Sequence, residues 1–119
     1  MSIKAEVRDS TAIAAACRRL GLAAPVTGEH NLFAGKVKGI GVQLKDWQYP
    51  VVFDLSTGQA SMDTFGGRWG DQKHLDAFFQ AYAVEKAKIE SRRQGHSVTE
   101  QTLADGSIKL TIQVSGGAA

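Results

Sequence analysis

The last third of the chain constrains the fold most strongly, because helix, stop and hairpin signals follow one another there. Asp71 can begin a helix, and Gly95 is the residue type that commonly ends one. Between them, apolar residues recur at the spacing of a single buried helix face. A long helix of this kind would anchor the fold. The residues of its predicted buried face are Leu75, Phe78, Phe79, Tyr82 and Ile89.

The segment after Gly95 predicts a β-hairpin whose loop length sets the pairing of its strands. A two-residue turn at Asp105-Gly106 would place Thr99 opposite Ile112. A three-residue Ala104-Asp105-Gly106 loop would instead pair Val98 with Ile112, and glycine at its third position suits the bulge of such a loop. The longer loop is therefore favoured. The apolar face of the second strand is formed by Ile108, Leu110, Ile112 and Val114.

The start of the chain predicts a strand and a shorter helix. Apolar and charged side chains alternate over residues 3–8, which is the period of a half-buried strand. Asp9 or Ser10 can cap the following helix, and Gly21 can end it. The predicted buried face of this helix includes Cys17, so the thiol is expected in the core. That face is formed by Ile13, Ala16, Cys17 and Leu20.

Residues 26–62 carry strand signals separated by glycine or polar turns. Gly35 can make one turn, and Ser56-Thr57-Gly58 predicts another before a short strand around Ala60. Pro50 has no amide hydrogen for a strand ladder, so it is expected at a strand start or on an edge.

These elements predict the α+β class: an antiparallel sheet with two helices packed on one face. A weak repeat also suggests two strand–helix–strand–strand halves forming one continuous sheet. At 119 residues, we expect a single domain over residues 1–114 and a flexible tail over residues 115–119. The repeat matches Val26-Thr27, Leu32 and Val37 with Val98-Thr99, Leu103 and Ile108.

Composition narrows the functional classes. The hydrophobic and charged fractions, 43% and 22%, are those of an ordinary globular protein. A net charge of +2 is too small to predict nucleic-acid binding. One cysteine allows neither an internal disulfide nor a thiolate metal cage. The alternating first residues do not fit a signal peptide, and no apolar run is long enough to cross a bilayer. We therefore expect a cytoplasmic protein with no membrane contact.

Several of these segments, in this order, resemble the hypothetical chloroplast reading frame thirty-five family of cyanobacteria, other bacteria and red-algal chloroplasts. That family is a domain of unknown function, and it supplies no catalytic residues to carry over. Its genes often lie beside those for AAA-type ATPases, which implies a helper or adaptor role. The usual Met-Ser-His opening is Met1-Ser2-Ile3 here, so a role for that histidine is not expected. The matching segments are Ile3-Lys4, Val7-Arg8-Asp9, Tyr82-Ala83, Lys86, Arg93-Gln94-Gly95, residues 98–101 and Asp105-Gly106-Ser107-Ile108.

Lys86 is the first candidate site residue, because it lies near the centre of the apolar face of the long helix. A buried ammonium is costly unless it is paired, so it could bind an anion or a partner's carboxylate. With Tyr82 and Arg68 it would form a small-molecule or anion site. The structural alternatives are a stem that packs while the amine reaches solvent, or a salt bridge, and these are favoured.

The glycine-rich segment before the long helix is the second candidate. Gly66-Gly67-Arg68-Trp69-Gly70 could expose amides to a phosphate, but the Lys-Ser/Thr of a P-loop is absent. A plain loop with Trp69 tucked under it is favoured. Trp69 could also join Trp47 and Tyr49 in an exposed aromatic patch, since aromatic residues beside arginine anchor interfaces. Core filling is the alternative, and only exposure separates the two.

Patterns for catalysis or metal binding are poor. His30, His74 and His96 lack metal-ligand spacing. Asp54 and Asp63 could approach each other across a hairpin, but solvated surface residues are the simpler interpretation. The basic residues Lys36, Lys38 and Lys45 could contact nucleic acid, although lysines that protect an edge strand are favoured.

The leading hypothesis is a small non-enzymatic interaction module, an adaptor or accessory subunit with a protein partner and no cofactor. The first alternative is an anion or small-molecule binder using Lys86 and Arg68. The second is a weak nucleic-acid binder. The sequence does not specify the oligomeric state.

Overall fold

A computed structural model of the chain describes residues 2–4 and 7–113. It confirms the predicted α+β class, with helices and antiparallel strands. The chain divides into two compact units, Met1–Tyr82 and Ala83–Ala119, and α2 (Gln72–Arg93) runs from the first into the second. Each unit is described by itself.

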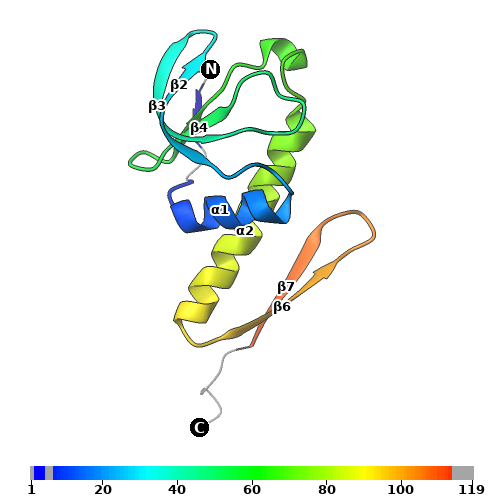
Figure 1. The fold of residues 1–119 in the computed structure, drawn as a ribbon. Coiled ribbons are helices and arrows are strands. Elements are labelled where there is room, and N and C mark those ends of the chain that lie inside the picture. The colour runs from blue at the N-terminus through cyan, green and yellow to red at the C-terminus, as the bar shows by residue number, and fades with distance from the viewer. Residues whose placement is uncertain (1, 5–6, 114–119) are drawn as a thin grey trace. The chain divides into compact units, whose positions relative to one another are not determined.

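The first unit is built on a five-stranded antiparallel sheet with the order β1-β5-β4-β3-β2. Figure 1 shows this sheet with α1 and the first half of α2 beside it. Pro50 lies directly before β4, where its missing amide hydrogen costs no ladder bond, as expected. The strands are β1 (Ser2–Lys4), β2 (Val26–Leu32), β3 (Gly35–Val42), β4 (Val51–Asp54) and β5 (Gln59–Ser61).

The core lies between one face of this sheet and α2. The register places Ile40, Phe53 and Ala60 side by side on three neighbouring strands, and all three are buried. Phe78 of α2 stacks on Phe53 with ring centroids 5.4 Å apart. Burying a side chain of this size stabilises the fold by about 1.5–3 kcal/mol. The predicted helix face is therefore confirmed at Leu75, Phe78 and Tyr82, which are buried.

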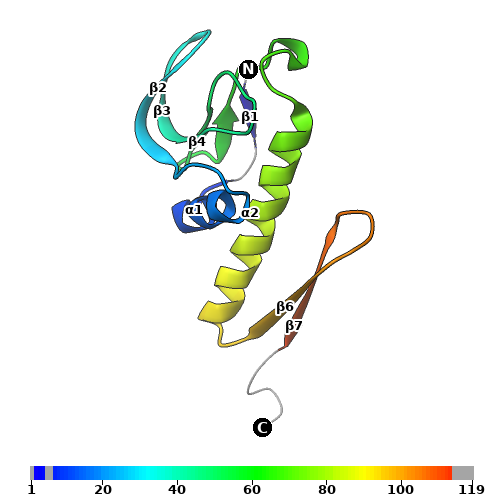
Figure 2. The ribbon, with the colours of Figure 1, turned by 45° about the vertical axis from the view of Figure 1, so that its right-hand side comes forward.

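Helix α1 (Ser10–Arg19) begins where the sequence predicts it. The Asp9 carboxylate accepts hydrogen bonds from the amides of Thr11 and Ala12, so Asp9 is the N-cap. The Tyr82 hydroxyl accepts from the amides of Arg8 and Asp9, which ties the start of α1 to α2. Figure 2 shows α1 beside α2. Cys17 is buried as expected, and burial raises the pKa of its thiol.

The β2–β3 hairpin is sharply curved, and two opposed glycines permit the curve. Gly28 pairs with Gly39, and both have positive φ, at 146° and 157°. A Cβ at Gly39 would collide with the Phe53 carbonyl oxygen, so no other residue fits there. At the tip of the hairpin the Ala34 amide donates to Asp63 Oδ2 at 3.0 Å. The tip is thereby fastened to the segment that precedes α2.

The second unit contains the last half of α2 and the hairpin of β6 (Ser97–Thr102) and β7 (Ile108–Gln113). Val98 pairs with Ile112, which confirms the register predicted for the three-residue loop. The Leu103 amide donates to the Ser107 carbonyl and closes that loop, in which Gly106 has φ of 88°. The glycine is thus required by the left-handed backbone.

Two expectations about the fold are wrong. In the described residues the strands form two sheets instead of one continuous sheet, because β6 and β7 pair only with each other. The hairpin closes its own hydrogen bonds and adds no strand to either edge of the larger sheet. Leu20 is exposed at the C-cap of α1 and does not belong to the buried face. The predicted strand residues Ala5 and Glu6, the boundary at residue 114 and the tail lie outside the described residues.

Among the described residues, no helix is both long enough and apolar enough to cross a bilayer.

Candidate functional site

The first unit carries a cluster of four aromatic side chains that is formed by three loops. We call Phe33, Tyr49, Phe65 and Trp69 the aromatic cluster. Trp69 is its centre: ring centroids lie 5.1 Å away in Phe33, 5.5 Å in Tyr49 and 4.7 Å in Phe65. Phe33 comes from the β2–β3 turn, Tyr49 from the segment before β4, and the other two from the segment before α2. Residues far apart in the sequence therefore form one surface.

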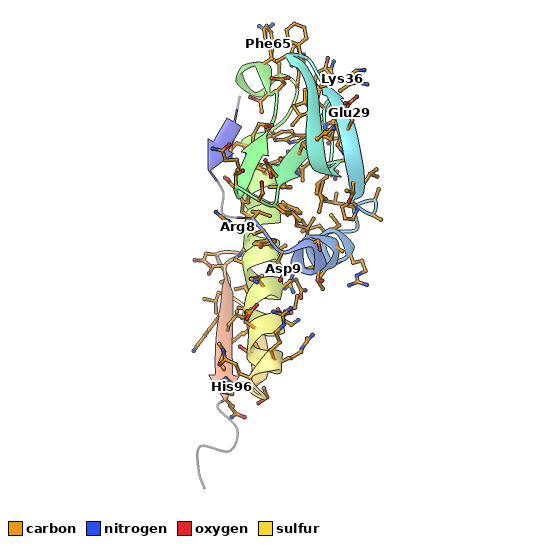
Figure 3. The ribbon with its side chains drawn as sticks, turned by 90° about the vertical axis from the view of Figure 1, so that its left-hand side faces the viewer. Arg8, Asp9, Glu29, Lys36, Phe65 and His96 are labelled. Atoms are coloured by element: carbon orange, nitrogen blue, oxygen red, sulfur yellow. The ribbon has the colours of Figure 1, made fainter. Side chains whose placement is uncertain are left out.

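The aromatic cluster is open to solvent. The exposed fraction is 70% for Phe33 and 58% for Phe65, while Tyr49 and Trp69 are half-buried. Figure 3 shows Phe65 projecting outward at the end of the unit where the loops lie. Scattered apolar residues are normal on a protein surface, but grouped exposed aromatic rings are typical of an interaction surface.

Local backbone chemistry holds the cluster in place. The Trp69 amide donates to the Thr64 carbonyl at 2.9 Å, which closes the loop around Gly66 and Gly67. Both glycines have positive φ, and so does Phe65, at 46°. A left-handed conformation is costly for a bulky residue. The stacking of Phe65 on Trp69 offsets part of this cost, so the loop presents Phe65 in one defined position.

Hydrogen bonds also fix Tyr49 beside the cluster. The Gln48 amide donates to the Trp69 carbonyl at 2.7 Å and joins the segment before β4 to the segment before α2. Tyr49 then meets Trp69 edge to face, with an interplanar angle of 69°. The arrangement thus depends on backbone bonds as well as on ring contacts.

Trp47 is a core residue, so an exposed patch that includes it is wrong. Its exposed fraction is 5%, and its indole Nε1 donates to the Asp71 carbonyl at 3.0 Å. The ring also packs so closely on Gly70 that a Cβ at that position would collide with it. A buried indole with a satisfied N–H is the ordinary structural use of tryptophan. The patch predicted around Tyr49 and Trp69 therefore forms without Trp47.

The polar groups of the cluster are hydrogen-bond donors without protein partners in the described chain. Neither the Trp69 indole Nε1 nor the Tyr49 hydroxyl has a hydrogen bond to described residues. The Arg68 guanidinium lies over the Phe65 ring, with Cζ 5.6 Å from the centroid, and forms no ion pair with them. The surface can therefore offer two neutral donors and one cation to a ligand.

A cavity of about 330 Å³ is lined by residues at the tip of the β2–β3 hairpin and by two residues that follow β4 in the chain. The polar side chains of its lining are Lys36, Ser61 and Asp63. Asp63 Oδ2 already accepts a hydrogen bond from the Ala34 amide. Lys36 Nζ lies 3.6 Å from Glu29 Oε1, and both residues are labelled in Figure 3. Phe33 and Ala34 adjoin in sequence, as do Asp63, Thr64 and Phe65, so the cavity and the cluster share the same loops.

The three residues predicted for an anion site have separate local partners. Lys86 Nζ forms an ion pair with Glu90 Oε1 at 2.9 Å, one helical turn away. The Tyr82 hydroxyl is occupied by the amides of Arg8 and Asp9, and Arg68 lies over Phe65. The salt-bridge interpretation of Lys86 is therefore confirmed. Each of these three residues therefore has a local contact of its own.

The aspartates that could have formed a pair are each used locally. Asp54 Oδ1 accepts from the hydroxyl and amide of Ser56, and these hydrogen bonds hold the pKa of its carboxyl below the usual range. Asp63 instead fastens Ala34, as described above. Within residues 2–4 and 7–113, no group of three or more His, Cys, Asp or Glu side chains could hold a metal ion.

Sequence reasoning found half of the aromatic cluster. It named Tyr49 and Trp69 but missed Phe33 and Phe65. Phe65 stands directly before Gly66-Gly67, and Phe33 stands directly before the Ala34-Gly35 turn. A bulky aromatic residue next to a turn has few neighbours to cover it, and that signal could have indicated exposure.

Comparisons with known proteins add no further guide to this site. No family model, curated protein or solved structure matches the chain. The resemblance to the chloroplast reading frame family therefore stays a hypothesis. The function has to be argued from the aromatic cluster and its surroundings.

Proposed function

We propose that this protein is a small non-enzymatic interaction module, an adaptor or accessory subunit of a larger protein assembly. Its contact surface would be the aromatic cluster together with Arg68. The observation that carries this proposal is the exposure of Phe33 and Phe65 around Trp69, at 70% and 58%. Tryptophan, tyrosine and arginine are the residues that most often dominate binding energy at protein interfaces.

The construction of the site supports binding more than simple surface filling. Three loops and a left-handed Phe65 place apolar rings in solvent, although water contact with such rings is unfavourable. Structural need does not explain this arrangement, because Phe53 and Phe78 already fill the core. A partner that covers the rings would recover the free energy of burying them.

The proposal places the protein in the cytoplasm, where its one cysteine, a buried thiol, would remain reduced. The family resemblance suggests an AAA-type ATPase as one partner to examine. Nucleic acid is disfavoured as the partner, because the net charge is only +2 and Lys36 is close to Glu29.

Affinity capture from native lysate, with Trp69→Ala and Phe65→Ala beside the wild type, tests this proposal. We expect a specific partner that the wild type retains and both variants lose. Truncating a hot-spot residue costs about 2 kcal/mol or more of binding free energy, which is roughly thirtyfold in affinity.

Leu103→Ala is the matched control for this capture. Leu103 is an exposed apolar residue in the loop of the second unit, 40% exposed and outside the cluster. Its loss should leave capture unchanged. If all three variants retain the partner while remaining folded by circular dichroism, the aromatic cluster is not the contact surface.

A further inference from the structure

The unpartnered side-chain polar groups of the aromatic cluster and Arg68 can all donate, and among them only the Tyr49 hydroxyl can also accept, which limits what can bind there. The Trp69 indole N–H and the Tyr49 hydroxyl have no hydrogen bond to the described residues, and Arg68 has no ion pair with them. A ligand that brings several donors would find only the Tyr49 hydroxyl among these groups to accept them, so the other donors would stay unpaired on binding. The complementary ligand is therefore rich in acceptors, poor in donors and apolar.

Proline meets these three conditions within a peptide chain. It has no backbone N–H, while its carbonyl remains an acceptor. Its ring is apolar and packs on aromatic side chains. A proline-rich segment also holds the polyproline II conformation before binding, so little conformational entropy is lost. Aromatic-lined surfaces with donors between the rings are a recurring way to recognise such segments.

The charge beside the cluster specifies one further feature of the partner. Arg68 lies over Phe65 as a cation without a carboxylate partner in the described chain. In sequence, Arg68 lies between Gly66-Gly67 and Gly70, and the nearest acidic residues are Asp63 and Asp71, neither of which forms an ion pair with it in the described chain. An Asp or Glu next to the prolines would pair with Arg68, whereas a Lys or Arg there would be repelled.

We infer that the aromatic cluster binds a proline-rich segment of a partner protein, in which an acidic residue flanks the prolines and pairs with Arg68. The inference rests on the proposed function, because it names the partner class of the same surface. The Phe33, Tyr49 and Phe65 rings around Trp69 would pack against the proline rings. Trp69 and Tyr49 would donate to the carbonyls between them.

Single-stranded nucleic acid is the main competing ligand, and the ring geometry disfavours it. Base stacking needs an open ring face. Trp69 already meets three rings, one of them stacked with an interplanar angle of 21°. The Arg68 guanidinium lies over the Phe65 ring. The faces that Phe65 and Trp69 turn toward each other are therefore already used within the cluster, which leaves fewer ring faces for bases to stack on.

Selection from a random dodecapeptide library displayed on phage tests this inference with the full-length protein. We expect the selected peptides to be enriched in proline with a flanking Asp or Glu. Their affinity should fall about thirtyfold or more in Trp69→Ala, and Arg68→Ala should weaken binding while removing the preference for the acid. Leu103→Ala should bind as the wild type does.

The other outcomes separate the proline inference from the proposed interaction surface. Peptides that depend on Trp69 but lack proline would overturn the proline inference and leave the interaction surface standing. Selection of no peptide, or of peptides indifferent to Trp69→Ala, would overturn the proline inference, and capture of a partner by the wild type but not by Trp69→Ala would still uphold the interaction surface. Tighter Trp69-dependent binding of a twelve-nucleotide oligothymidine than of any selected peptide would assign the surface to nucleic acid instead.

Discussion

At the scale of single residues, the two tyrosines differ in what their hydroxyls do. The Tyr82 hydroxyl accepts two backbone amides, those of Arg8 and Asp9, at 3.2 and 3.1 Å. The Tyr49 hydroxyl has no partner in the described chain. We predict that Tyr82→Phe lowers the free energy of unfolding by about 1–2 kcal/mol, because two amides at the start of α1 lose their acceptor.

Chemical denaturation of the two variants measures this difference. Tyr49→Phe is the matched control, since it removes the same atom from an unpaired position, and it should change stability by only a few tenths of a kcal/mol. Equal midpoints for Tyr82→Phe and the wild type would contradict the role assigned to Tyr82 in holding α1.

A second prediction at this scale concerns Asp105. The hydroxyl and amide of Ser107 donate to its carboxylate and hold its pKa below the usual range. Because the pKa is lower in the folded state, the stabilising contribution is complete above the unfolded pKa. It is lost as pH falls through the folded pKa. We predict that Ser107→Ala raises the pKa of Asp105 toward its ordinary value.

Titration of the carboxyl ¹³C shifts by NMR measures this change. Asp54 is an internal control in the same sample, because Ser56 lowers its pKa in the same way and is unaltered. A pKa of Asp105 that does not move in Ser107→Ala would show that the hydrogen bond from the Ser107 hydroxyl does not lower it.

Some residue-level features could be predicted from the sequence and others could not. A helix cap at Asp9 or Ser10 and the burial of Cys17 followed from local spacing; the structure confirms both and selects Asp9 as the cap. Trp47 and Trp69 could not be separated, because both stand in polar, glycine- or proline-containing segments. Only the folded chain decides that Trp47 reaches the Asp71 carbonyl, while Trp69 meets Phe33 from a distant turn.

At the scale of elements, the β6–β7 loop gives a sharp test of backbone conformation. Gly106 has φ of 88°, and the space where its Cβ would lie is open. Any effect of a side chain there comes from the left-handed backbone alone. We predict that Gly106→Ala costs about 1–2 kcal/mol in hairpin stability, and that Gly106→Asn costs less because asparagine tolerates this region.

Cross-strand NOEs between β6 and β7, together with amide exchange rates in β7, would follow the hairpin in both variants. Pairing should weaken in the order wild type, Gly106→Asn, Gly106→Ala. If alanine is tolerated as well as glycine, the loop does not need the left-handed residue that set its predicted register.

The helices and strands show which features local sequence patterns can predict and which they cannot. Periodicity and caps predicted α1, α2 and the register of the final hairpin, because each depends on neighbours in the sequence. The curve of the β2–β3 hairpin could not be predicted from the sequence, because a glycine permits a positive φ without requiring it. That Gly28 lies opposite Gly39 can be known only from the strand register. That a Cβ at Gly39 is excluded can be known only from the position of Phe53.

At the scale of the whole molecule, the α+β class was predictable and the division of the strands was not. The weak repeat is consistent with the order of elements, since β1-α1-β2-β3 and β5-α2-β6-β7 each run strand–helix–strand–strand. Nevertheless, in the described residues the second hairpin forms its own sheet. Sequence similarity between segments does not determine which strand edges pair, because pairing depends on three-dimensional contacts.

The aromatic cluster belongs to this scale too, because it exists only when three separate loops come together. Its sequence signals are individually weak: one or two aromatic residues in each of three loop segments. The aromatic residues come together because two hydrogen bonds join the loops. The Ala34 amide at the hairpin tip donates to the Asp63 carboxylate, and the Gln48 amide donates to the Trp69 carbonyl. The proposal of an interaction module rests on that assembly.

The most direct test uses the two indole N–H resonances in one ¹⁵N–¹H spectrum, recorded as the captured partner is added. Trp47 Nε1–H is bonded to the Asp71 carbonyl in the core, whereas Trp69 Nε1–H lies in the exposed cluster. We predict that the Trp69 resonance shifts or broadens while the Trp47 resonance keeps its position. A bound partner that leaves Trp69 unchanged would contradict the assignment of this surface.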